Sequence, residues 1–292
     1  MAEFAGALTA LVTPFRDGEV DERALRDLVE RQIAAGIDGL VPCGTTGENV
    51  TLTHAEYARV VRTVVDQTRK RVPVVAGSGT NSTRHTIELS EAARGAGVDG
   101  LLLVVPYYNK PTQEGLYRHF RAVAETVPIP SLVYNIPGRT GIDMTLATLG
   151  RLADVASIVG VKEATGNVLR SADIAAEFGD RFTILSGDDA LTLAVLVVGG
   201  HGVISVASNV APAEVARLVR LFREGDVAGA RALAQRLRPL FDAMFVESNP
   251  GPVKAALAMR GVIAPELRLP MVMPSEASQA VIRAALERVG IA

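Results

Sequence analysis

Eight short apolar runs recur along the chain, and each is followed by polar or glycine-rich residues. They begin near Leu8, Gly39, Val72, Leu101, Ser131, Ser157, Phe182 and Gly202. The runs are apolar throughout rather than alternating, which is typical of parallel strands covered on both faces. The first seven starts lie about 29 residues apart, the spacing expected of a repeated strand, loop and helix unit.

The segments between these runs carry helix patterns with recognisable boundaries. Thr53 and Glu56 form a capping-box pattern, which opens a predicted helix that continues through Val65. Asp21 can cap the preceding helix, and Gly36 can end it. The sequence therefore predicts strands and helices that alternate.

Eight such units predict an α/β fold, a (β/α)₈ barrel with right-handed crossovers. An open doubly wound sheet is the alternative, but no G-x-G-x-x-G follows the first strand. The barrel is expected over residues 1–224. Residues 225–292 form a predicted C-terminal helical region with helix starts near Asp226, Pro250 and Ser275. We expect this region to pack on the barrel rather than fold alone.

Composition narrows the possible partners. Hydrophobic residues make up 48% of the chain and charged residues 21%, with a net charge of −2. This balance indicates a globular protein and argues against nucleic acid as the main ligand. No signal-peptide pattern or bilayer-length apolar run is present. Cys43 is the single cysteine, so an internal disulfide is impossible and a reducing cytoplasm fits. We expect no membrane partner.

In a (β/α)₈ barrel the active site forms where the carboxyl ends of the strands meet. Residues predicted at these ends are Thr45, Thr46, Tyr107, Tyr108, Tyr134, Lys162, Gly187 and Ser205. Lys162 stands out, because only four of the thirty basic residues are lysines and this one follows an apolar strand. A buried lysine can lose its proton and attack a ketone to form an imine. The alternative is that Lys162 reaches solvent and merely covers the rim.

Other polar groups have simpler interpretations. Cys43 has no nearby histidine to activate it and is expected to be a small buried hydrophobe. Asp188 and Asp189 are expected to cap the helix that follows rather than hold a metal. Lys254 is interpreted as a helix-surface or packing residue. No histidine pair has metal-ligand spacing in the sequence, so we expect neither a metal nor an organic cofactor.

Three motifs together resemble the dihydrodipicolinate synthase family. They are CGTTGE at 43–48, YNIPGRTG at 134–141 and GVKEATG at 160–166. The likeness continues through residues 106–109, 185–189, 199–205 and 247–250, so it covers nearly the whole chain in order. The resemblance implies that pyruvate forms an imine with a lysine and then condenses with (S)-aspartate 4-semialdehyde, giving 4-hydroxy-tetrahydrodipicolinate for lysine and diaminopimelate biosynthesis.

The resemblance also implies roles for the catalytic residues. Lys162 would form the imine, and Tyr134 would be the acid/base beside it. Thr45 would link Tyr134 to Tyr108, which in the family reaches over from a neighbouring subunit. The family is usually a homotetramer built as a pair of dimers, so an isolated subunit would have an incomplete proton relay.

Further residues follow from the same resemblance as substrate-binding groups. The amides of Thr45 and Thr46 would hold the pyruvate carboxylate, while Gly187 and Ile204 would contribute backbone groups. Arg139 would bind the carboxylate of the semialdehyde, because its guanidinium can hold a carboxylate with two hydrogen bonds. An Arg139 paired with a surface acid is the alternative. Two other functions stay open: a sialic-acid or deoxy-sugar-acid aldolase or lyase of the same superfamily, and a non-catalytic keto-acid-binding protein.

Regulation is the point at which the resemblance weakens. Members inhibited by lysine use an effector site at the subunit interface, and this chain keeps Asn81, His54 and Tyr107 at the corresponding positions. His85 stands where the family has a glutamate, and Asn49 replaces a smaller residue. Loss of the carboxylate removes the charge partner of the effector's ammonium group. We therefore expect weak or absent feedback by lysine.

Overall fold

A computed structural model describes residues 4–291 of the 292-residue chain. The eight predicted strands form one parallel sheet: β1 (Gly6–Ala10), β4 (Gly39–Val41), β5 (Val75–Gly77), β6 (Gly100–Val104), β7 (Ser131–Asn135), β8 (Ile158–Glu163), β9 (Thr183–Ser186) and β10 (Gly202–Ser205). Their order is β4-β1-β10-β9-β8-β7-β6-β5, and a parallel bridge between Leu40 and Val74 joins the two ends. The sheet is thus a nearly closed barrel, as predicted. A small antiparallel pair, β2 (Phe15–Arg16) and β3 (Glu19–Val20), was not predicted.

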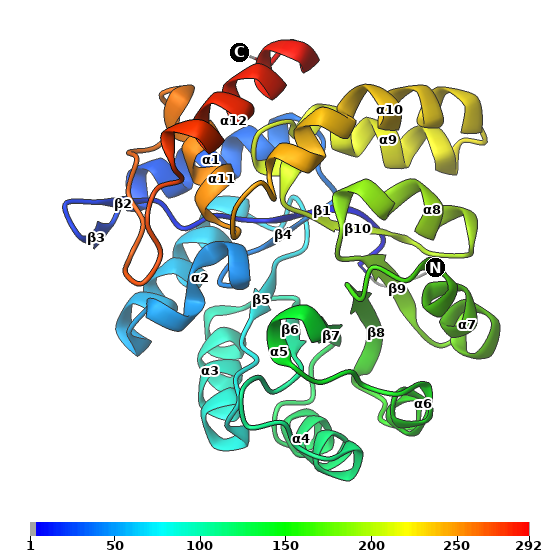
Figure 1. The fold of residues 1–292 in the computed structure, drawn as a ribbon. Helices are drawn as coiled ribbons and strands as arrows, with labels where there is room; N and C mark the ends of the chain where they lie inside the picture. The colour runs from blue at the N-terminus through cyan, green and yellow to red at the C-terminus, as the bar shows by residue number, and fades with distance from the viewer. Residues whose placement is uncertain (1–3, 292) are drawn as a thin grey trace.

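Helices surround the central strands (Figure 1). The helices that follow the strands are α1 (Glu22–Ala34), α2 (His54–Thr68), α3 (Thr83–Ala96), α4 (Gln113–Thr126), α6 (Leu146–Ala153), α7 (Val168–Phe178), α8 (Thr192–Val197) and α9 (Pro212–Arg223). The capping box at the start of α2 is confirmed, because the Thr53 amide donates to Glu56 Oε2 at 2.8 Å and Thr53 Oγ1 accepts from the Glu56 amide. Asp21 caps α1 by accepting a hydrogen bond from the Ala24 amide.

Alternate residues of each strand pack into two different apolar cores. One core fills the barrel interior and includes Leu8, Leu132 and Tyr134. The other, which includes Val133 and Val161, fills the layer between strands and helices. Because side chains alternate along a strand, the interior side of β7 and β8 presents polar groups only near their carboxyl ends.

The C-terminal region consists of α10 (Val227–Ala243), α11 (Gly251–Met259) and α12 (Glu276–Val289). Each predicted helix start lies one residue before the observed helix, and α9 ends beside Glu224 as expected. In Figure 1, α10 lies along α9, and α12 packs against α10 and α11. Among residues 4–291, no helix has the length and apolar character needed to cross a membrane.

Candidate active site

Lys162 lies inside the barrel near the carboxyl end of β8. It is 5% exposed, and it pairs across the sheet with Tyr134 on β7. Burial lowers the pKa of Lys162 to about 7, an effect that Arg139 reinforces and that the negative charge of Asp189 opposes. The amine therefore loses its proton far more readily than an exposed lysine. The position contradicts the alternative in which Lys162 merely reaches solvent.

Tyr134 is placed to deliver a proton beside this amine. The Lys162 Nζ atom lies 4.1 Å from the centroid of the Tyr134 ring. Burial raises the pKa of Tyr134 to about 12, which the charge of Arg139 and a hydrogen bond with Thr45 partly offset. The phenol thus stays protonated at neutral pH and can donate a proton. Thr45 and Tyr134 line one cavity together with Lys162.

The pKa of Lys162 predicts how imine formation depends on pH. Below pH 7 the ammonium form predominates and cannot attack pyruvate, whereas above pH 7 the neutral amine predominates. The second-order rate constant at low pyruvate should rise about tenfold from pH 5 to pH 6 and level off above neutrality. Stopped-flow measurement of imine formation checks this. A rate constant that keeps rising to pH 10 would contradict a lowered pKa.

A short turn after β4 presents Thr45 and Thr46 to the cavity. This turn is the 3₁₀ helix η1 (Thr45–Gly47), and amides at the start of a helical turn have no partner within it. They are therefore free to bind a carboxylate. Asn249 Nδ2 donates to Thr46 Oγ1 at 3.0 Å and holds this side chain in place.

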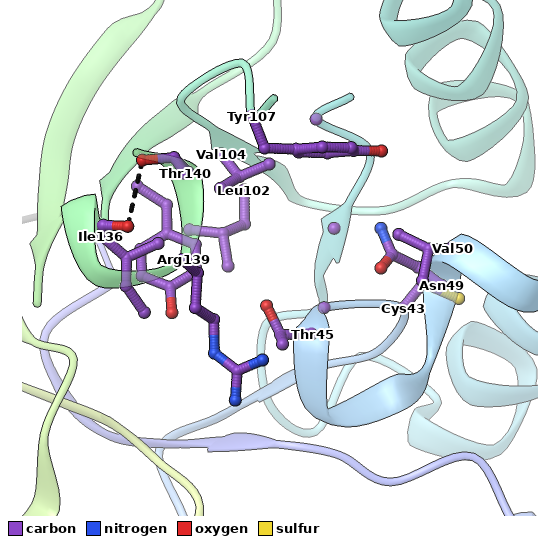
Figure 2. Close-up of a pocket in the computed structure, with 14 residues that line it drawn as sticks. Cys43, Thr45, Asn49, Val50, Leu102, Val104, Tyr107, Ile136, Arg139 and Thr140 are labelled. Carbon is purple, nitrogen blue, oxygen red and sulfur yellow. Dashed lines mark hydrogen bonds between the residues drawn. The ribbon is translucent and has the colours of Figure 1, made fainter. Parts of the chain in front are cut away.

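Arg139 stands at the mouth of the cavity on the short helix α5 (Pro137–Thr140). Its Nη2 donates to the backbone carbonyl of Asn249 at 3.0 Å, rather than to a surface acid. Figure 2 shows Arg139 and Thr45 extending toward the same space. Asn249 thus touches both predicted carboxylate-binding groups. Asn249 lies in the motif at 247–250 that resembles the family, but the sequence predicted no role for it.

A buried ion pair between Lys254 and Glu48 also holds the turn that carries Thr45 and Thr46. Lys254 Nζ lies 2.6 Å from Glu48 Oε1, and both side chains are almost completely buried. The Arg268 amide donates to the other oxygen of Glu48 at 3.0 Å. Of the two interpretations of Lys254, the helix-surface one is therefore wrong and the packing one is right: the side chain is fully buried, and Glu48 compensates its charge. The interpretation missed this because Glu48 is 206 residues away in sequence.

The two aspartates after β9 have different surroundings. Asp188 accepts a hydrogen bond from the Ala190 amide at 2.9 Å, so the predicted cap is confirmed for this residue. Asp189 instead is buried, and its carboxylate accepts hydrogen bonds from Ser205 Oγ and from the amides of Val206 and Ala207. The capping expectation is wrong for Asp189, which links the ends of β9 and β10 and places a negative charge near Lys162.

Gly187 leaves just enough room for the reactive lysine. A Cβ atom on Gly187 would lie 2.5 Å from the Ala164 Cβ and 3.2 Å from the Lys162 Cε. Ile204 is fully buried in the barrel interior on β10, opposite Leu8 of β1. Both predicted binding positions are thus at the interior side of the rim.

Substitution of Gly187 by alanine should therefore displace Lys162 and lower kcat/KM for pyruvate about 10²-fold, because small shifts of a reacting group are costly. Steady-state kinetics with varied pyruvate measures the effect. Gly95→Ala is the matched control, since a Cβ there meets no atom within 4 Å. If Gly187→Ala had the same kinetics as the control, a Cβ at position 187 would not displace Lys162.

The two neighbouring tyrosines after β6 face different directions. Tyr107 is half-buried and lines the cavity with Asn49, and burial raises the pKa of its phenol (Figure 2). Tyr108 is 87% exposed and has a φ of +72°, which a non-glycine residue rarely adopts. It does not line the cavity of its own chain.

Burial raises the pKa of Cys43, and this thiol is the buried residue that was expected.

Two of the predicted effector positions, Asn49 and Tyr107, line the cavity. The Asn81 carbonyl accepts a hydrogen bond from the Asn109 side chain at 2.8 Å. His54 and His85 begin neighbouring helices, with His54 Nε2 lying 3.2 Å from His85 Nδ1. The two histidines are thus in contact with each other.

A buried amine beside a phenol and an arginine at the rim is an arrangement suited to a (β/α)₈ enzyme that reacts with a carbonyl compound. The chain matches the Dihydrodipicolinate synthetase family over residues 3–289 and belongs to it. The family resemblance inferred from the motifs is confirmed.

Relatives match along their whole length. The 4-hydroxy-tetrahydrodipicolinate synthase of Nitratidesulfovibrio vulgaris (strain DSM 19637 / Miyazaki F) is 55% identical, with 99% of each chain covered. The structure of that synthase from Methylacidiphilum fumariolicum SolV has a TM-score of 0.97 and 47% identity, and it covers 99% of this chain and 96% of its own. A dihydrodipicolinate synthase of Acinetobacter baumannii, solved in complex with pyruvate, has a TM-score of 0.97 and 42% identity, with 99% of this chain and 100% of its own covered.

Proposed function

We propose that this chain condenses pyruvate with (S)-aspartate 4-semialdehyde to give 4-hydroxy-tetrahydrodipicolinate. The observation that carries the proposal is a buried Lys162 whose pKa is lowered to about 7, beside a protonated Tyr134. The full-length relatives that carry this activity in their names support the choice of reaction.

The first half of the reaction joins pyruvate to the lysine. The amides of Thr45 and Thr46 bind the pyruvate carboxylate, and the neutral Lys162 amine attacks the ketone carbon. Tyr134 protonates the departing hydroxyl, which leaves as water, and an imine forms. Loss of a proton from the methyl group gives an enamine, whose carbon is nucleophilic.

The second half consumes the aldehyde. The enamine carbon adds to the aldehyde carbon, while Arg139 binds the substrate carboxylate with two hydrogen bonds. The amine of the substrate then attacks the imine carbon, closes a six-membered ring and releases Lys162. The Gly138-Arg139-Thr140 sequence, which resembles the synthase pattern, supports this aldehyde over sugar-acid substrates. Among residues 4–291, no carboxylate pairs with the Arg139 guanidinium, which lines the cavity.

Product analysis tests the proposal. The chain is incubated with pyruvate and (S)-aspartate 4-semialdehyde, and the product is identified by NMR. Formation of the cyclic hydroxy acid is expected. Trapping of pyruvate on the enzyme without condensation would favour another aldolase or lyase of the superfamily. No trapping at all would favour a keto-acid-binding protein.

A homotetramer is part of the proposal. Tyr108 projects from its own chain, as expected of a residue that completes a neighbour's proton relay. Leu169 and Val197 are apolar side chains that are 72% and 61% exposed, and such side chains favour a contact with another subunit. Sedimentation velocity measures the mass in solution, and a monomer with full activity would contradict both the assembly and the role of Tyr108.

Feedback by lysine should be weak or absent. His85 offers an imidazole where the family effector site has a carboxylate, so the ammonium group of a bound lysine would lack its charge partner. Activity measured with up to millimolar lysine should stay within about twofold of the uninhibited rate. Strong inhibition anywhere in this millimolar range would show this expectation to be wrong.

A further inference from the structure

Three metal-ligating side chains meet where α2 and α3 begin. His54 is the first residue of α2, and His85 and Glu88 lie one turn apart on α3. One nitrogen of each histidine and one oxygen of Glu88 lie within 4.8 Å of one another. Within residues 4–291, this is the one group of three or more such side chains that could hold a metal ion.

The distances fit the ligand shell of a small transition-metal ion. His54 Nε2 lies 3.2 Å from His85 Nδ1, and the same Nδ1 lies 3.4 Å from Glu88 Oε2. In a tetrahedral site with metal–ligand bonds of about 2.0–2.1 Å, ligand atoms lie about 3.3 Å apart. An ion can therefore contact both nitrogens with little movement, and the exposed Glu88 side chain can turn to join them.

The two facing ring nitrogens cannot both present a lone pair to each other. The nitrogens face each other, and the ring centroids are 4.7 Å apart. If both nitrogens carried lone pairs they would repel, so either a proton or a metal ion must lie between them. A metal ion satisfies both lone pairs, and Glu88 adds a negative charge. Arg84, which is 3.7 Å from Glu88 and 90% exposed at its side chain, competes only weakly for that carboxylate.

We propose that His54, His85 and Glu88 bind one divalent transition-metal ion of the Zn²⁺ type and leave a fourth position open to water or an external ligand. Two imidazoles and one carboxylate are a donor set that Zn²⁺, Co²⁺ and Ni²⁺ accept, whereas Mg²⁺ and Ca²⁺ prefer oxygen ligands. The ion would join α2 to α3 a few residues from Asn49 and Val50, which line a cavity together with Thr45, Tyr134 and Arg139. The site does not depend on the proposed reaction.

Metal binding to the tag-free chain tests this proposal. Cobalt absorption reports coordination by nitrogen ligands, and Zn²⁺ is then titrated against bound Co²⁺. One ion per chain is expected, with no displacement by excess Mg²⁺. Zn²⁺ should also raise the melting temperature, because a ligand bound only by the folded state stabilises it.

Variants locate the ion. Loss of an outer partner alone costs about 10- to 100-fold in metal affinity, so His54→Ala and His85→Ala should each cost at least that. Glu88→Gln should weaken binding, whereas the matched control Glu91→Gln, an exposed acid one turn further along α3, should not. Absence of binding, or affinity unchanged in both histidine variants, would overturn the proposal. Circular dichroism of each variant shows that the fold is retained.

Discussion

Lys162→Ala should lower kcat at least about 10⁴-fold, the scale of loss seen when a covalent nucleophile is removed. The reason is that Lys162 is the buried amine of the cavity, and among the described lysines no other lines it. Steady-state kinetics with both substrates measures the loss. Circular dichroism should show an unchanged fold, because the variant removes a buried amine that no described carboxylate pairs with.

Lys70→Ala is the matched control for this experiment. Lys70 is 79% exposed at its side chain and contacts Asp99 at 3.8 Å, far from the rim. Its kinetics should equal those of the unmodified chain. Residual activity of Lys162→Ala within tenfold of the control would mean that the chemistry does not pass through this amine.

Lys254→Met should destabilise the fold by about 3–5 kcal/mol, because it leaves the buried Glu48 carboxylate without its partner. Equilibrium unfolding in urea measures the loss. Adding Glu48→Gln should restore part of it, since the second substitution removes the uncompensated charge. The KM for pyruvate should also rise, because Glu48 directly follows the turn that carries Thr45 and Thr46.

Lys70→Met is the matched control for stability, because exposed ion pairs contribute about 0–1 kcal/mol. If Lys254→Met cost no more than this control, the pair would not anchor the turn. A large loss would support our proposal that residues 225–292 pack on the barrel as a dependent region, since the pair joins α11 to the rim.

The barrel could be predicted because its pattern is local. Each strand is a continuous apolar run, and many helices begin at a side-chain cap close to them in sequence, as Thr53 and Glu56 show for α2. β5 begins at Val75, three residues after the predicted start at Val72. Pro73 lies between them, and proline cannot donate a hydrogen bond to a neighbouring strand.

Much of the candidate site was also predictable, because strand ends meet at one rim. Lys162, Tyr134 and Thr45 come together there as expected. The sequence could not distinguish the two buried lysines, however. Burial lowers the pKa of both amines, but at Lys254 the Glu48 carboxylate, 2.6 Å away, opposes that effect through its charge and a hydrogen bond. Lys162 pairs with no carboxylate among the described residues, and burial lowers its pKa to about 7. That difference depends on contacts between distant parts of the chain.

The roles of Asn249 and Asp189 were missed for the same reason. Asn249 contacts Thr46, which is 203 residues away, and Asp189 accepts hydrogen bonds from the turn after the next strand. No local pattern marks either contact. The clearest sequence signal was that both residues lie within motifs shared with the family, at 247–250 and 185–189.

Covalent capture of pyruvate tests the central claim most directly. The chain is treated with pyruvate and borohydride, digested with trypsin and mapped by mass spectrometry. Reduction of the imine leaves a carboxyethyl group on the lysine, which blocks cleavage there, so the label should lie on the peptide spanning residues 152–170. An unlabelled chain, or a label on Lys70, Lys110 or Lys254 instead, would contradict the account.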